Sequence, residues 1–309
     1  MTDHDPHRVD PDDEGRHHPA DLPYWNESVY LDFVADDGAI AGYARIGLYP
    51  NLGVTWWTTV ILGRDRPLVT SLAYDLPVGE GTGLVLGSGG VDVAAVVERP
   101  LGTMSVRGSA VAAVHADPAA VYRREPGRPT RIGLDLTWET DGTPYQYDIT
   151  TRYEIPCLVT GSVSVGEERI EVVGQGQRDH SWGERDWWAF RWCWSAARLD
   201  DGTRVHLTNI RFPDQQFGVG YIQREGSVEA LTDGAVVEEL GAEGFPVGAT
   251  ATYQPSGLAL TLEPIAFGPV LLESPDGKLC RFPRALARFT AEDGRSGLGW
   301  VEWGQPQPV

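Results

Sequence analysis

Lysine is almost absent from this chain, which has only Lys278, so arginine supplies nearly all of its 25 basic residues. Acidic residues number 44, and the net charge is −19. Such a charge repels nucleic-acid phosphates and anionic membrane surfaces. We therefore expect no nucleic-acid partner and interpret the acidity as a source of solubility.

Long apolar runs are also missing, since no stretch approaches the ~20 apolar residues that span a bilayer. The first residues, MTDHDPHRVDPDDEGRHHPAD, contain no apolar core of a secretory signal. The three cysteines, Cys157, Cys193 and Cys280, lack metal-ligand spacing and cannot all pair, which is typical of a reducing compartment. We expect a cytoplasmic protein without an integral membrane segment.

Helix signals are scarce, whereas strand signals run along most of the chain from Tyr24 onward. In SVYLDFVA the apolar residues alternate with period two, and six Asp-Gly pairs suited to tight hairpins separate apolar runs. The only helix start is DPAAVYRRE, with Asp117 as N-cap and Pro118 at the first position. This pattern predicts an all-β protein made of antiparallel barrels or sandwiches, and the length suits two such units in tandem.

The polar residues 1–22 lack periodicity and predict a disordered acidic tail. Four of the seven histidines lie there (His4, His7, His17 and His18), and we expect only adventitious metal binding from them. The two β units are predicted over residues 23–165 and 166–309, with the boundary in the hairpin CLVTGSVSVGEERIEVVG.

One segment, GQGQRDHSWGERDWWAFRWCW at 174–194, concentrates six charged residues and a histidine beside five tryptophans. Within it Trp188, Phe190, Trp192 and Trp194 occupy alternate positions, so on a strand their rings share one face. Such a stripe can form part of a core, or it can line a pocket for a flat or polyene-like ligand.

The charged part, RDHSWGERD, admits two chemical interpretations and a structural one. Asp179 could orient and activate His180 for proton exchange, or could itself be an acid whose pKa an apolar pocket containing Trp182 raises. Adjacent strand residues point to opposite faces, so Asp179 and His180 touch only if the backbone bends. Alternatively, the motif's arginines and carboxylates pair in a buried network that locks two domains together.

The stretch GQGQRDHSWGERDW resembles the Asp-His-(Asn/Ser)-Trp-Gly motif of the carotenoid 1,2-hydratase (hydroxyneurosporene synthase) and AttH-like superfamily. It is most similar to a bacterial branch carrying Arg-Asp-His-Ser-Trp-Gly before an aromatic strand; Diels–Alderase-type cyclases are more distant members. The closing GLGWVEWG resembles that superfamily's last strand. The resemblance implies two lipocalin-like barrels in tandem, an apolar pocket near their interface, and motif residues at Asp179, His180, Trp182 and Gly183.

The hydratases also have an acidic Tyr/Asp pair on the strand after the motif, where this chain reads VHLTNI. His206 and Asn209 stand roughly where that pair is expected, and this departure argues against carotenoid hydration itself. The fold also does not fix the reaction. Glu302, flanked by Trp300 and Trp303, is either a pocket carboxylate or a cross-strand ion-pair partner.

We therefore hypothesise a cofactor-independent enzyme that hydrates, dehydrates, isomerises or cyclises a hydrophobic isoprenoid, steroid or polyketide-like substrate. No P-loop, G-x-S-x-G elbow or H-E-x-x-H motif is present, and no metal is expected. The predicted proton-transfer residues are Asp179, His180 and His206, and the predicted substrate-binding residues are Trp182, Trp188, Trp192, Trp194, Arg178 and Asn209. The main rival is a lipocalin-like carrier of a hydrophobic small molecule, in which the motif is an interdomain lock.

Overall fold

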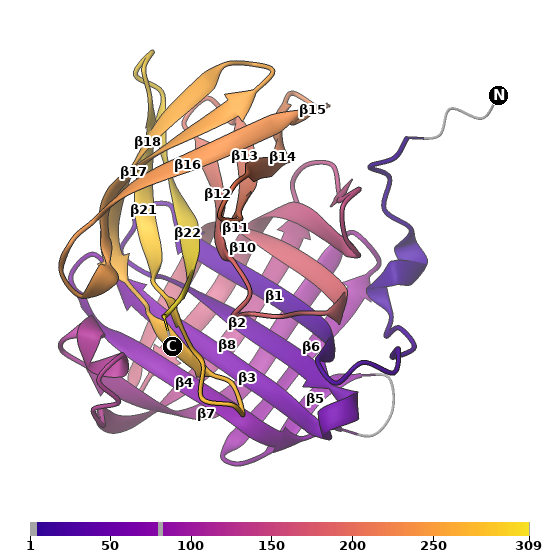
Figure 1. The fold of residues 1–309 in the computed structure, drawn as a ribbon. Coiled ribbons are helices and arrows are strands. Elements are labelled where there is room, and N and C mark those ends of the chain that lie inside the picture. The colour runs from indigo at the N-terminus through magenta and orange to yellow at the C-terminus, as the bar shows by residue number, and fades with distance from the viewer. Residues whose placement is uncertain (1–4, 80–82, 309) are drawn as a thin grey trace.

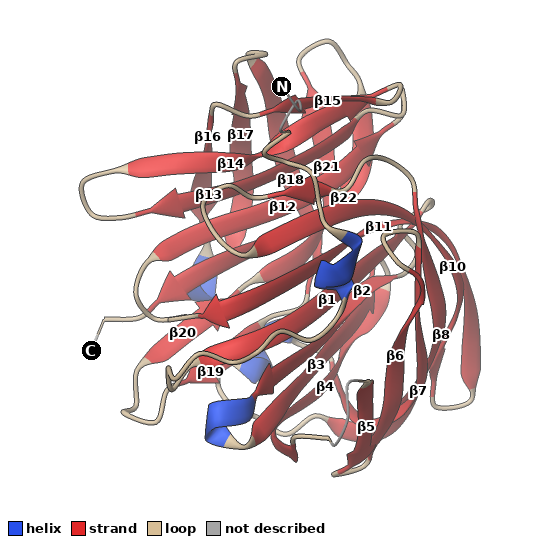
Figure 2. Ribbon diagram, turned by 90° about the vertical axis from the view of Figure 1, so that its right-hand side faces the viewer, coloured by secondary structure: helices blue, strands red, loops and turns tan. Residues whose placement is uncertain are grey.

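The computed structural model, which describes residues 5–79 and 83–308, consists of two large antiparallel sheets that curl into barrel-like shapes (Figure 1). Strands dominate both halves, and the helical elements are single 3-10 turns (Figure 2). These turns are η1 (Pro11–Glu14), η2 (Pro50–Leu52), η3 (Pro118–Val121) and η4 (Ala242–Gly244). The predicted all-β class is confirmed, and the predicted helix start forms η3, where the Asp117 side chain accepts from Ala119 N at 3.0 Å.

The first sheet has the strand order β4-β3-β2-β1-β11-β10-β8-β7-β6-β5, and β9 pairs with β10. An additional pairing of β4 with β7 closes this sheet into a barrel. Its strands are β1 (Trp25–Ala35), β2 (Ala41–Tyr49), β3 (Val54–Gly63), β4 (Arg66–Pro77), β5 (Leu84–Ser88), β6 (Val91–Arg99), β7 (Thr103–His115), β8 (Arg128–Thr140), β9 (Tyr145–Gln146), β10 (Arg152–Val165) and β11 (Glu168–Glu184).

The second sheet has the order β15-β14-β13-β12-β22-β21-β18-β17-β16, with the small β19–β20 hairpin attached to β22. The sheet curls until β16 returns beside β14, where Gly218 N donates to the Asp233 carboxylate at 2.9 Å. Its strands are β12 (Arg191–Leu199), β13 (Arg204–Arg211), β14 (Gln216–Arg224), β15 (Ser227–Ala230), β16 (Asp233–Leu240), β17 (Pro246–Gln254), β18 (Leu258–Phe267), β19 (Val270–Glu273), β20 (Leu279–Phe282), β21 (Arg284–Ala291) and β22 (Ser296–Pro306).

Strand β1 lies between two apolar clusters, and every one of its residues is buried. Its alternate apolar residues Val29, Leu31 and Phe33 belong to the core of the first barrel. Tyr30 and Val34, on the other face, pack in a separate cluster with apolar residues of the second sheet. The second barrel therefore packs against the outer face of the first barrel at β1 and β2.

The chain passes from the first sheet to the second over residues 185–190. The boundary that we predicted near residue 165 instead falls inside the β10–β11 hairpin, both strands of which belong to the first sheet. Strand β11 lies between β10 and β1, so the whole RDHSWG motif is part of the first barrel and faces the second along one side.

The segment expected to be a disordered tail is instead packed on the first barrel over residues 5–22, while residues 1–4 lie outside the described part (Figure 1). Val9 is buried in the core of that barrel. The buried Glu14 carboxylate pairs with Arg178 at 2.8 Å, and the His7 ring stacks on Tyr145 with centroids 4.4 Å apart. Composition predicted disorder because the segment's few anchoring side chains are scattered among polar residues.

Two smaller expectations can be compared with the structure. The three cysteines are free and buried. Across residues 5–79 and 83–308 we find no helix with the length and apolar character needed to cross a membrane.

Candidate functional site

A cavity of about 380 Å³ lies between the two sheets. That volume falls within the range of roughly 300–1,000 Å³ that is usual for small-molecule sites. Strand register explains which side chains meet there. In the first sheet Tyr30 on β1 and Glu154 on β10 flank Asp179 on β11. In the second sheet Thr208 on β13 and Glu302 on β22 flank Trp194 on β12, and the two rows face each other.

Asp179 lies on the cavity wall as the buried acid of this site. Burial is the main reason that its pKa is raised to about 8; the nearby charge of Arg152 opposes this shift and that of Glu154 adds to it. Arg152 donates to Asp179 Oδ2 at 2.7 Å and to Glu154 Oε1 at 2.7 Å. A pKa of about 8 favours the protonated form at neutral pH, and Oδ1 is then the protonated oxygen because Oδ2 accepts from Arg152.

Glu154 holds the negative charge of this pair. Burial raises the pKa of Glu154. The charge of Arg152, then the electrostatic interaction with His206 and the hydrogen bonds from Trp194 and Gln177, outweigh burial, so the pKa of Glu154 is lowered. Trp194 Nε1 and Gln177 Nε2 both donate to its carboxylate, each at 2.9 Å. Two neighbouring carboxyl groups whose pKa values are driven apart are typical of acid–base sites.

His206 does not line the cavity but is hydrogen-bonded to Tyr147, which does. Its Nδ1–H donates to the carbonyl oxygen of Ser195 at 3.0 Å, so Nε2 is an acceptor and takes a hydrogen bond from the Tyr147 hydroxyl at 2.6 Å. Burial lowers the pKa of His206 to about 4, so the ring is neutral at neutral pH. Tyr147 itself lines the cavity, and His206 reaches a ligand only through that hydroxyl.

Glu302 fits both interpretations that the sequence left open. It lines the cavity and pairs with Arg284 Nε at 2.8 Å. The same carboxylate oxygen accepts from the Tyr30 hydroxyl at 2.7 Å and from Trp300 Nε1 at 3.1 Å. Tyr30 and Glu302 belong to different barrels, so this bond also ties the two barrels together across the cavity.

Three of the four aromatic residues in the predicted stripe line the cavity, and the fourth, Trp188, packs elsewhere. Trp192 and Trp194 on β12 and Phe190 just before it line the cavity, and Trp187 lines it too. Trp188 instead makes an edge-to-face contact with Tyr24, with ring centroids 6.1 Å apart. Strand alternation holds only from Arg191 onward, because residues 185–190 form the connection between the sheets.

The remaining predicted site residues face away from the cavity. Alternate residues of β11 point to opposite sides of the sheet. His180, Trp182 and Arg178 therefore lie on the face opposite the cavity, where residues of the N-terminal segment contact them. His180 Nδ1 lies 3.2 Å from the Tyr153 hydroxyl, and its Nε2 contacts Glu27. Asn209 faces the interior of the second barrel.

These placements have clear bonding partners. Trp182 stacks on His17 with centroids 3.7 Å apart, and Asn209 donates to the carbonyl oxygen of Gly234 at 3.1 Å. The pKa of Asp179 is therefore shifted by burial and neighbouring charges and not by contact with Trp182. The structure brings Asp179, Trp192 and Trp194 together at the cavity, with His206 behind it.

Sequence reasoning missed Tyr147, Arg152 and Glu154. One signal could have found the last two: Val165 and Glu168 flank the tight turn of the β10–β11 hairpin, and counting back along both strands pairs Glu154 with Asp179. Tyr147 has no comparable signal, because it follows the short strand β9 and reaches the site through tertiary packing alone.

The fold, two lipocalin-like barrels in tandem, is the one that the resemblance drawn from the motif implied. Three solved structures share the fold. They are a protein from Nitrosomonas europaea assigned as an AttH (TM-score 0.69, 15% identity, 96% of each chain covered), kievitone hydratase from Nectria haematococca (0.63, 10%, 91% of this chain and 88% of that one), and CghA with Sch210972 (0.61, 13%, 92% and 89%).

The chain belongs to the DUF7064 family, a domain of unknown function, which it matches over residues 10–307. No curated protein sequence matches it.

Proposed function

We propose that the chain is an enzyme that transfers protons to and from a hydrophobic substrate in the cavity between its barrels, with Asp179 as the acid. The substrate class would be isoprenoid, steroid or polyketide-like, and the reaction a hydration, dehydration, isomerisation or cyclisation. The observation that carries this proposal is a buried carboxyl group, Asp179, on the wall of an aromatic-lined cavity, where burial raises its pKa to about 8. Two proteins of the same fold, kievitone hydratase and CghA with Sch210972, are consistent with this class.

The proposed reaction needs no reagent other than water. Asp179 Oδ1 gives its proton to one carbon of an alkene, or to a leaving hydroxyl group, and Arg152 stabilises the carboxylate that remains. The cationic carbon faces Trp192 and Trp194, whose rings would stabilise it by about 0.5–2 kcal/mol for each favourable contact. Water then adds to that carbon, or a neighbouring C–H bond gives up its proton, and the proton returns to Asp179.

Tyr147 and His206 would have a positioning role in this scheme. The neutral His206 ring accepts from Tyr147 and fixes the direction of the phenol beside Thr208, whose hydroxyl lies 2.8 Å from that of Tyr147. A polar group of the substrate can then be held in one orientation relative to Asp179. His180 has no part in the step because it lies on the other side of β11.

Isotope exchange tests the proposal without knowing the substrate in advance. The full chain is incubated in D2O with a panel of isoprenoid, steroid and polyketide-type alkenes and tertiary alcohols, and the products are analysed by liquid chromatography and mass spectrometry. Wild type should incorporate deuterium into, or add or remove water from, at least one compound. Asp179→Asn should bind that compound without converting it, and the surface variant Asp135→Asn should convert it normally.

A carrier is the second candidate, because Arg152 pairs with both Asp179 and Glu154, and Trp194 of the second barrel donates to Glu154, so the network would also serve as a lock between the barrels. Wild type that binds compounds tightly but exchanges no deuterium into any of them would favour the carrier. Conversion that persists in Asp179→Asn would show that another group supplies the proton.

A further inference from the structure

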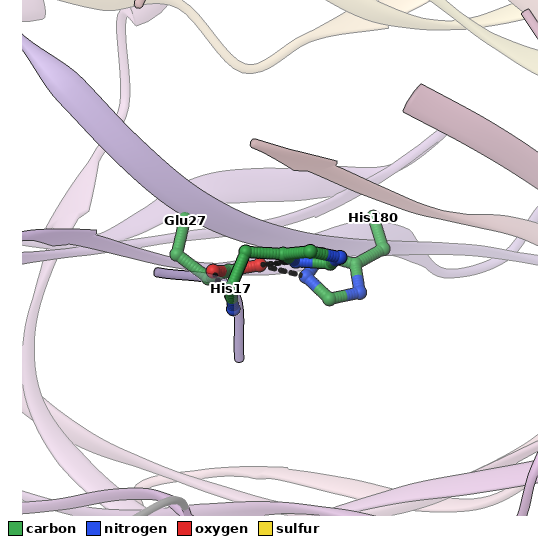
Figure 3. A group of neighbouring side chains, drawn as sticks. All are labelled: His17, Glu27 and His180. Carbon is green, nitrogen blue, oxygen red and sulfur yellow. Dashed lines mark hydrogen bonds and ion pairs between the residues drawn. The ribbon is translucent and has the colours of Figure 1, made fainter. Parts of the chain in front are cut away.

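A second cluster of ionisable side chains lies on the opposite face of β11 from the cavity. It consists of His17 in the N-terminal segment, Glu27 on β1 and His180 on β11, and Figure 3 shows the three side chains converging. One donor atom from each residue lies within 4.8 Å of the other two. None of these atoms takes part in the proposed reaction.

Both imidazole rings direct a nitrogen at the same carboxylate oxygen. His17 Nδ1 lies 3.0 Å from Glu27 Oε1, and His180 Nε2 contacts that oxygen as well (Figure 3). The backbone N–H of His17 donates to Oε2 of Glu27 at 2.7 Å. Burial raises the pKa of Glu27. The hydrogen bond and charge of His180, and then the side-chain and backbone hydrogen bonds from His17, outweigh burial, so the pKa of Glu27 is lowered. Glu27 is therefore an anion.

The outer nitrogens of the two rings also have partners. His17 Nε2 lies 3.4 Å from Asp13 Oδ1, and His180 Nδ1 lies 3.2 Å from the Tyr153 hydroxyl. Each ring is thus held from its far side, and His17 Nδ1, Glu27 Oε1 and His180 Nε2 converge on one point.

We propose that His17, Glu27 and His180 bind a divalent transition metal, with zinc the best match. Two imidazoles and one carboxylate are the ligand set of several protein zinc sites, in which Zn–N and Zn–O bonds are about 2.0–2.2 Å. The corresponding distance between ligand atoms, about 3.3–3.5 Å, needs only small movements of these side chains. Asp13 on His17 and Tyr153 on His180 supply the outer-sphere partners that metal-bound histidines usually have.

The site would join the N-terminal segment to the first barrel, since one ligand comes from that segment and two from the barrel. His17 is 22% exposed, whereas Glu27 and His180 are buried, so a metal can enter from the His17 side and keep one position for water. The expectation from sequence was only adventitious binding by the terminal histidines, because they lie in a segment that composition predicted to be disordered and His180 is far from it along the chain.

Zinc titration of the untagged full chain tests the proposal. After treatment with a chelator and dialysis, zinc is titrated against a chromophoric competitor, and cobalt(II) is added separately to record its visible absorption. Wild type should bind one equivalent of zinc and raise its Tm on binding. Loss of an outer-sphere partner typically weakens a metal site about 10- to 100-fold, so loss of a ligand in His17→Ala or Glu27→Gln should weaken zinc binding at least about 100-fold.

The matched control is His18→Ala, which removes the neighbouring exposed histidine and should bind as wild type does. Equal losses in His17→Ala and His18→Ala would mean adventitious binding by the terminal histidines and would overturn the proposal. No zinc binding by wild type would also overturn it and would leave the cluster as a hydrogen-bonded contact between the N-terminal segment and the first barrel. Circular dichroism confirms that each variant is folded. None of these outcomes bears on Asp179 or on the proposed reaction.

Discussion

Replacing Asp179 by Asn should stabilise the protein, and the gain should grow with pH. In the folded protein burial raises the pKa of Asp179 from 3.8 to about 8. Between these two values the unfolded chain has an ionised Asp179 and the folded chain a neutral one, so the stability of wild type falls as pH rises. Below the lower value both states are protonated, and this contribution is absent.

The magnitude follows from about 1.36 kcal/mol per pKa unit. Between pH 5.5 and pH 7.5 the free-energy penalty on folding of wild type grows by the equivalent of about two pKa units, or about 3 kcal/mol. Asn keeps the shape of the neutral carboxyl and an oxygen that accepts from Arg152, but it does not titrate. The stability difference between Asp179→Asn and wild type should therefore increase by about 3 kcal/mol over this interval.

Urea unfolding followed by tryptophan fluorescence at both pH values measures this difference. Asp135→Asn is the control, because this carboxylate is 61% exposed on β8, and its effect should be similar at both pH values. A difference between Asp179→Asn and wild type that does not change with pH would refute the reasoning, since Asp179 would then be ionised in the folded protein.

Three further substitutions test the network around the site and the N-terminal segment. Glu154→Gln leaves Arg152, which is partly buried, without its anionic partner and should lower the free energy of unfolding at pH 7 by about 1–3 kcal/mol, measured by urea unfolding. Tyr147→Phe leaves the buried Nε2 of His206 without a hydrogen bond and should cost about 1–3 kcal/mol in the same assay. Glu14→Ala removes the partner of the buried Arg178 and should make residues 5–22 sensitive to limited proteolysis, whereas wild type resists cleavage there.

Local patterns predicted the fold class well. Alternation in β1 and the Asp-Gly turns identify strands and hairpins because both depend on neighbouring residues. The sheet to which β11 belongs depends on its pairing with β1, about 150 residues earlier in the chain. The boundary near residue 165 was placed at a hairpin for want of that information.

The candidate site could be predicted in part for the same reason. Strand alternation separates Asp179 from His180, but it does not say which face meets the second barrel. The partner of Asp179 comes from β10, and those of His180 come from β1, from β10 and from the N-terminal segment. Composition assigned that segment to a disordered tail, although Val9 and Glu14 anchor it on the barrel.

The protonation state of Asp179 is the central claim, and infrared difference spectroscopy of wild type and Asp179→Asn measures it directly. At pH 7 the difference spectrum should contain the carbonyl stretch of a protonated carboxylic acid, and this band should disappear as pH is raised past about 8. A carboxylate band in its place at pH 7 would contradict the claim, because Asp179 would then have no proton to give to a substrate.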